Sequence, residues 1–161
     1  MYDDIYFIRP FTRKDIKVFY LENVDFDKIP LLESSNTLSE FKTNVVHTFK
    51  LLSKYLPKHC IKNYVTHTPH PLNIQYFYDI LKKFDILNPS LKKIPIWNVV
   101  YHNMFSFENN INTKQIDESY KLGIYSKTNK KIPGPETLIL NHDERGLSEN
   151  KWLLELRKSL I

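Results

Sequence analysis

Short apolar runs alternate with segments of helical periodicity along this chain, and this alternation constrains its fold more than any other feature. Consecutive apolar residues are typical of a strand covered on both faces, whereas apolar residues three and four positions apart are typical of an amphipathic helix. The runs that predict strands or extended pieces are Ile5–Ile8, Val18–Leu21, Asn63–Thr66, Leu122–Tyr125 and Thr137–Leu140. The segments that predict helices run from a capping box at Thr37 and Glu40 to Pro57, from Leu72 to Phe84, over Trp97–Met104, and from Ser148 onward. The pattern predicts an α/β protein with a mixed sheet and flanking helices.

The size and composition of the chain favour one hydrophobic core. Its 161 residues are 42% apolar and include ten Phe and ten Tyr, which excludes an intrinsically disordered protein. A chain of this length is expected to form a single domain over residues 1–161. Within this core, the helix from Leu72 to Phe84 is expected to bury Ile74, Phe77, Tyr78 and Leu81.

Several features indicate a soluble protein of a reducing compartment. Cys60 is the only cysteine, so an internal disulfide is excluded. The acidic start of the chain is unlike a signal peptide, and no run approaches the ~18 apolar residues of a membrane span. We therefore expect a cytoplasmic protein without a membrane span. The net charge of +5 is spread along the sequence without a continuous basic stripe, so nucleic acid is not an expected partner.

The first polar cluster is the acidic pair Asp3–Asp4, immediately before a predicted strand. Paired carboxylates at a strand end are hard oxygen ligands, which suit Mg²⁺, Mn²⁺ or Ca²⁺ and, through the metal, a diphosphate. Adjacent residues of a regular strand point to opposite faces, so the pair is also compatible with solvated terminal charges.

The second cluster is His67-Thr68-Pro69-His70-Pro71, which leads into a predicted helix. The prolines favour an extended backbone that delivers imidazole to a helix start, where free amides favour a phosphate. Imidazole at such a place acts as base, acid, nucleophile or phosphate ligand. The alternative is structural, with one histidine capping the helix and the other filling a polar gap.

The third cluster runs from Asn141 to Gly146, directly after a predicted strand. Ligands of α/β sheets bind beyond the carboxyl ends of strands. Asp143 is a candidate for binding metal or a sugar hydroxyl, and Arg145 is a candidate for a forked phosphate contact. An ordinary polar connection is an equally good interpretation. His102 and Asn103, on a predicted helix, are interpreted as a satisfied buried polar pair.

Together and in order, these clusters resemble motifs of the Stealth-type sugar-phosphate transferases of cell-surface polysaccharide synthesis. Asp3-Asp4-Ile5-Tyr6-Phe7 resembles their acidic-aromatic strand, and His67-Thr68-Pro69-His70 resembles their His-x-Pro-His block. Leu140-Asn141-His142-Asp143 is similar to their final Leu-Asn-Asp block. The sequence departs from this pattern in three ways: Tyr2 stands in place of Asn, His142 separates Asn141 from Asp143, and the family's arginine has no match.

The resemblance implies a core like that of nucleotide-sugar (GT-A-like) transferases and a reaction that uses a divalent metal. A sugar or sugar 1-phosphate would move from a nucleotide-sugar donor to a hydroxyl of a glycan acceptor. Asp3 and Asp4 would bind the metal, and His67 and Asp4 would be catalytic. His70, Asn141, Asp143 and Arg145 would bind substrate.

The family's first apolar strand, which holds the nucleotide, has no counterpart before Asp3. We therefore expect residues 1–161 to represent the C-terminal portion of such a transferase, with a separate N-terminal partner chain or self-association completing the sheet. The alternative hypothesis is a non-catalytic remnant that binds a glycan or a partner chain.

Overall fold

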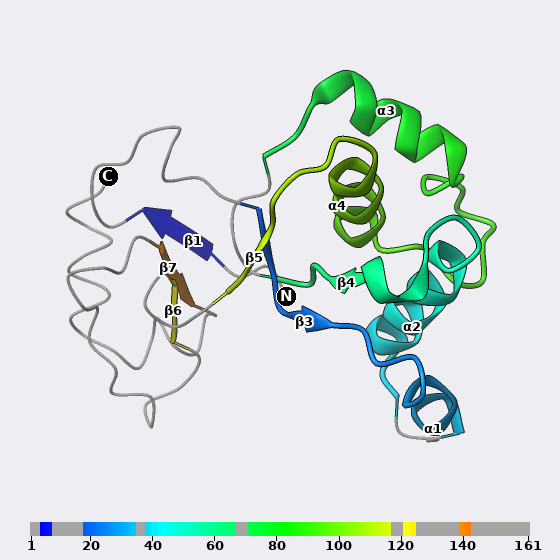
Figure 1. Ribbon diagram of the computed structural model, residues 1–161. Helices are drawn as coiled ribbons and strands as arrows, with labels where there is room; N and C mark the ends of the chain where they lie inside the picture. Colours follow the sequence, from blue (N-terminus) through cyan, green and yellow to red (C-terminus); the bar gives the residue numbers. More distant parts are fainter. Residues whose placement is uncertain are drawn as a thin grey trace. The chain divides into compact units, whose positions relative to one another are not determined.

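A computed structural model of the protein describes residues 4–7, 18–34, 38–66, 71–116, 121–124 and 139–142 (Figure 1). The chain divides into two compact units. Unit 1 comprises Met1–Ile16, His67–Pro69 and Ile116–Ile161, and unit 2 comprises Lys17–Thr66 and His70–Gln115. Both helices and strands are present, which confirms the predicted α/β class. The prediction of a single domain over residues 1–161 stays a prediction.

Unit 1 contains a mixed three-stranded sheet. Its strands are β1 (Asp4–Phe7), β6 (Lys121–Ile124) and β7 (Ile139–His142), in the order β1-β7-β6. β7 is antiparallel to β1 and parallel to β6, as the prediction of a mixed sheet required. The strand boundaries differ from the predicted ones: Asp4 is the first residue of β1, and β7 continues through Asn141 and His142, which the sequence placed in a connection.

Unit 2 is mainly helical. Its helices are α1 (Ile29–Ser34), α2 (Glu40–Leu52), α3 (Ile74–Lys83) and α4 (Trp97–Glu108), with a short 3₁₀ helix η1 (Lys58–Cys60). Two short ribbons accompany them. β2 (Phe19–Tyr20) pairs in parallel with β5 (Lys114–Gln115), and β3 (Glu22–Asn23) pairs antiparallel with β4 (Lys62–Asn63).

Helix α4 is the centre of the core of unit 2. Figure 1 shows α3 above it and β4 below it, and α4 contacts both of them as well as α2. Every residue from Val99 to Met104 is buried, including His102 and Asn103, so this helix is enclosed on all sides. The Tyr101 hydroxyl accepts a hydrogen bond of 2.7 Å from the Asn73 amide, which joins the start of α3 to α4.

The start of α2 and the burial of α3 differ from the predictions. Ser39, and not Thr37, is the N-cap of α2, since its side chain accepts from the Lys42 amide. Of the four predicted core residues of α3, Phe77 and Leu81 are partly buried and pack against the core, whereas Ile74 and Tyr78 are more than 60% exposed. The buried residue of α3 is Ile80, which was not among the four.

Helices α3 and α4 end in the same way. Asp85 and Asn110 each have a φ of 51°, a left-handed conformation that Asp and Asn tolerate better than most residues. After α3, the amides of Asp85 and Ile86 bond to the carbonyls of Lys82 and Leu81. After α4, the amides of Asn110 and Ile111 bond in the same pattern, so both ends are Schellman motifs without glycine.

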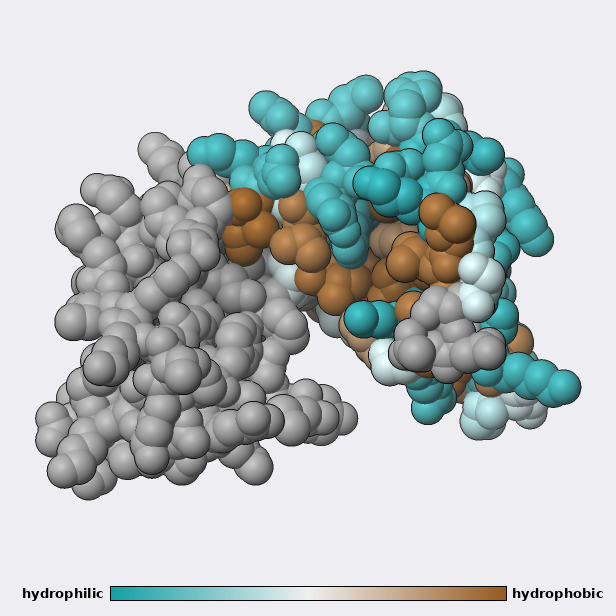
Figure 2. All heavy atoms as spheres, turned by 90° about the horizontal axis from the view of Figure 1, so that it is seen from below, coloured by the Kyte–Doolittle hydropathy of each residue, from teal (hydrophilic) through white to brown (hydrophobic). Residues whose placement is uncertain are grey.

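Part of the apolar surface of unit 2 stays exposed. Figure 2 shows apolar side chains gathered between polar regions on one face of this unit. Over the described part of the chain, no helix is long and apolar enough to cross a membrane.

Candidate functional site

The sheet of unit 1 brings two of the predicted polar clusters together, although they come from opposite ends of the chain. Asp4 of β1 is paired in register with His142 of β7, and Ile5 is paired with Asn141. On the other side of β7, Asn141 is paired with Gly123 and His142 with Ile124. The backbone therefore places the acidic strand directly beside the Asn-His segment.

Asp4 and Asn141 belong to successive cross-strand pairs of β1 and β7. His142 occupies the register position opposite Asp4. In the Leu-Asn-Asp motif, His142 was interpreted as an interruption between Asn141 and Asp143. The strand pairing instead makes His142 the cross-strand partner of Asp4.

The other predicted site residues lie outside the described residues. These are Asp3, His67, His70, Asp143 and Arg145. Among the described residues, no group of three or more His, Cys, Asp or Glu side chains could hold a metal ion. Asp3 lies outside the described residues and the structure describes Asp4 by its backbone pairing alone, so metal binding by Asp3 and Asp4 stays a prediction.

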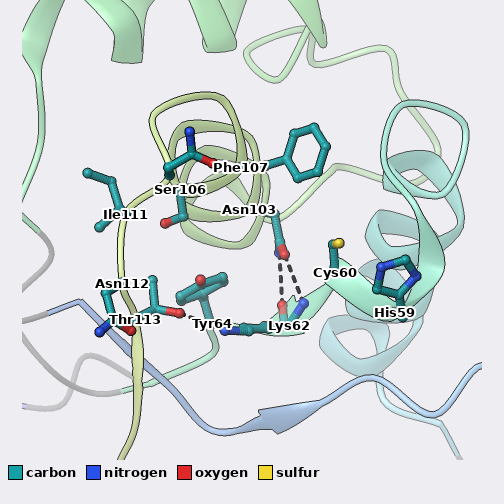
Figure 3. Close-up of a pocket in the computed structure, with 11 residues that line it drawn as sticks. His59, Cys60, Lys62, Tyr64, Asn103, Ser106, Phe107, Ile111, Asn112 and Thr113 are labelled. Carbon is teal, nitrogen blue, oxygen red and sulfur yellow. Dashed lines mark hydrogen bonds between the residues drawn. The ribbon is translucent and has the colours of Figure 1, made fainter.

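Unit 2 contains a pocket that the sequence did not predict (Figure 3). Its volume is about 480 Å³, within the range of ~300–1,000 Å³ that is usual for small-molecule sites. It lies between η1 and β4 on one side and the second half of α4 with the following segment on the other. The lining residues are His59, Cys60, Lys62, Tyr64, Asn103, Ser106, Phe107, Asn110, Ile111, Asn112 and Thr113.

Asn103 holds one wall of the pocket against the other. Its Oδ1 accepts from the Lys62 amide at 2.8 Å, and its Nδ2 donates to the Lys62 carbonyl at 2.8 Å and to the Val99 carbonyl at 2.9 Å. Figure 3 shows the two bonds to Lys62. Since Asn103 is buried and these bonds use both ends of its amide, its interpretation as a satisfied buried polar residue is confirmed.

Lys62 supplies a positive charge in a fixed position. Its Nζ donates to Thr113 Oγ1 at 2.8 Å and lies 4.3 Å from the centroid of the Tyr20 ring. A cation over an aromatic face gains ~0.5–2 kcal/mol. Within the described ranges, the ion pairs are Lys28 with Asp25 and Lys50 with Glu33, so Lys62 has no carboxylate partner there.

Hydroxyl groups gather beside this charge. The Tyr64 side chain is 1% exposed, and burial raises the pKa of its hydroxyl, an effect that hydrogen bonding from Thr113 and Ser106 to the phenolate would partly offset. Ser106 Oγ is buried and lies near enough to the Tyr64 hydroxyl to affect its pKa, but it makes no hydrogen bond of good geometry to any of the described residues. Figure 3 shows the Lys62 side chain extending from β4 toward Tyr64 and Thr113, with Ser106 on the neighbouring helix α4.

Two sequence signals were present for this pocket. Lys62 and Tyr64 are two positions apart on an extended segment, and Asn103 and Ser106 are three positions apart on a helix, so each pair shares a face. Neither spacing indicates that the two pairs meet, because the contact between them joins residues far apart in sequence.

Comparison with known proteins assigns no relative. No protein-family model matches the chain, and no curated protein and no solved structure matches it.

Proposed function

We propose that this chain is a metal-assisted transferase, or a portion of one, that moves a sugar or sugar 1-phosphate from a nucleotide-sugar to a hydroxyl of a surface polysaccharide or another glycan. Unit 1 would then be part of a GT-A-like core. The observation that carries the proposal is the pairing of β1 with β7, which puts Asp4 beside the segment of Asn141 and His142. The resemblance to the Stealth-type transferases implies that these two segments contribute to one reaction centre.

The residue types suit this chemistry. Asp3 and Asp4 would hold Mg²⁺, Mn²⁺ or Ca²⁺, since carboxylates are the oxygen ligands that these ions prefer. The metal, when bound, would neutralise the donor diphosphate. His67 would remove the proton of the acceptor hydroxyl or attack phosphorus itself.

The remaining residues would bind substrate. Arg145 suits a forked contact to phosphate, and Asn141, Asp143 and His70 suit hydroxyl or phosphate oxygens. His67 and His70 lie outside the described residues, so their assignments are supported by the motif alone.

A single assay separates the two forms of the reaction. The chain, alone and together with a candidate N-terminal partner chain, is incubated with a UDP-sugar, a glycan acceptor and Mn²⁺. Release of UMP indicates transfer of a sugar 1-phosphate, whereas release of UDP indicates transfer of the sugar. We expect turnover that EDTA abolishes.

Variants of two histidines test the assignment of His67. His67→Ala should abolish turnover, whereas His47→Gln, a change in helix α2, should leave it unchanged. Full turnover by His67→Ala would show that the catalytic assignment is wrong.

Calorimetry with the same UDP-sugar and Mn²⁺ tests the alternative of a non-catalytic glycan-binding or partner-binding protein. The absence of heat with the UDP-sugar, with and without the metal, would favour this alternative, as would binding of the glycan without any donor binding. The enzyme hypothesis requires both donor binding and product.

A further inference from the structure

We propose that the pocket of unit 2 binds a small anion that carries hydroxyl groups, of the size of a hexose phosphate. This inference does not depend on the proposed transferase reaction. Among the lining residues, none is assigned to that reaction, and all of them belong to unit 2.

Lys62 accounts for the negative charge of the ligand. It is half-buried, its position is set by Thr113 and Tyr20, and the lining residues include no carboxylate. Opposite charges attract each other more strongly at a partly buried site than in water, because the effective dielectric constant there is lower. The hydrogen bond to Thr113 already fixes the ammonium group of Lys62. Binding of an anion would therefore cost less side-chain entropy here than at a mobile surface lysine.

The uncharged polar groups account for the hydroxyls of the ligand. Thr113 uses its oxygen to accept from Lys62, so its own hydroxyl hydrogen remains to be donated. Asn112 lies next to it in the lining and has both donor and acceptor atoms. An anion without hydroxyls, such as phosphate alone, would use Lys62 and leave most of these groups in water.

The hydroxyl of Ser106 is the pocket group that would gain a hydrogen-bond partner from a ligand. A buried oxygen without a hydrogen bond is destabilising, and Ser106 Oγ is in that state with respect to the described residues. The residue as a whole is only partly buried, and a change of its χ1 rotamer would turn the hydroxyl toward the pocket. A ligand hydroxyl would then supply the missing partner.

Isothermal titration of the full chain with three probes tests the class of ligand. The probes are glucose 6-phosphate, inorganic phosphate and glucose. We expect glucose 6-phosphate to bind at least fivefold more tightly than either of the others, and to bind more weakly as NaCl is raised. Equal affinity for phosphate and glucose 6-phosphate would overturn the proposal, as would the absence of detectable binding at millimolar concentration.

Matched lysine variants locate the site. Lys62→Met keeps an unbranched apolar side chain over Tyr20 but removes the charge, and it should weaken binding of glucose 6-phosphate by about tenfold or more, or ~1.4 kcal/mol. Lys83→Met is the control, because Lys83 also lies over aromatic rings, those of Tyr55 and Phe84, but is not in the pocket. Equal affinity of the two variants would contradict the proposed site.

Ser106→Ala adds a test in which stability and binding change in opposite directions. Removing a buried hydroxyl that has no partner should leave the melting temperature unchanged or raise it. The same variant should bind glucose 6-phosphate several-fold more weakly. A loss of stability together with unchanged affinity would show that Ser106 has a structural role alone.

Discussion

The two units of this protein position their polar residues in different ways. In unit 1, backbone pairing between β1 and β7 places Asp4 opposite His142. In unit 2, the side chain of Asn103 bonds to the backbone of Lys62 and so joins β4 to α4. In this protein, the residues brought together by strand pairing belong to motifs that the sequence alone revealed. The residues joined by the buried side chain of Asn103 belong to no such motif.

The largest expected effect is the loss of the bridge in unit 2. Asn103→Leu removes three hydrogen bonds and leaves the backbone amide and carbonyl of Lys62 without these partners. Because each unsatisfied buried group costs ~1–3 kcal/mol, the free energy of unfolding should fall by about 3 kcal/mol or more in urea titrations.

Asn109→Ala is the control for this bridge. Asn109 is exposed and makes one side-chain bond, to the Phe105 carbonyl. This variant should lose at most ~0.5 kcal/mol. Similar losses for the two variants would mean that Asn103 does not join the two elements.

The second expected effect concerns activity and belongs to unit 1. If the proposed transferase reaction is correct, Asp4→Asn should lower turnover by ~100-fold, or ~2.7 kcal/mol in the activation free energy, because an amide binds a divalent cation poorly. The urea midpoint of the chain should change little. A large loss of stability with a proportionate loss of activity would instead assign Asp4 a structural role.

A smaller effect is expected at the end of helix α3. Asp85 has a φ of 51°, a conformation that costs a non-glycine residue ~1 kcal/mol. Glycine would relieve this strain, but it would also raise the conformational entropy of the unfolded chain, which offsets part of the stabilisation. Asp85→Gly also removes the hydrogen bond that Asn88 Nδ2 donates to Asp85 Oδ2 at 2.7 Å, so the free energy of unfolding should change by less than ~0.5 kcal/mol. Asp79→Gly, inside α3, should lower it by ~1 kcal/mol, and thermal unfolding of both variants measures the contrast.

The smallest expected effect is the pH dependence of unit 2 through His47. Burial, together with Lys93, Lys54 and Lys50, holds the pKa of His47 below its ordinary value of 6.5. The unfolded chain therefore binds this proton more readily, so stability is fully present above pH 6.5 and decreases as the pH falls below that value. His47→Gln should make urea midpoints less dependent on pH between 7.5 and 5, and an unchanged slope would contradict this.

Helix positions were largely predictable, because periodicity is a local property. The segments around α3 and α4 were located within a few residues. The buried residue of α3 was not predictable. Ile74 and Ile80 are both apolar, and only the direction from which α4 packs against α3 selects Ile80 for the core.

The sequence by itself determined the α/β character, the order of its polar segments, and the presence of an acidic strand and an Asn-His-Asp segment. The tertiary structure alone decided that Asp4 and His142 are paired in register on neighbouring strands, and that Lys62 and Asn103 meet to form a pocket. The physical reason is that both arrangements depend on contacts between residues distant in sequence. Burial of a common core selects such contacts, and no local spacing encodes them.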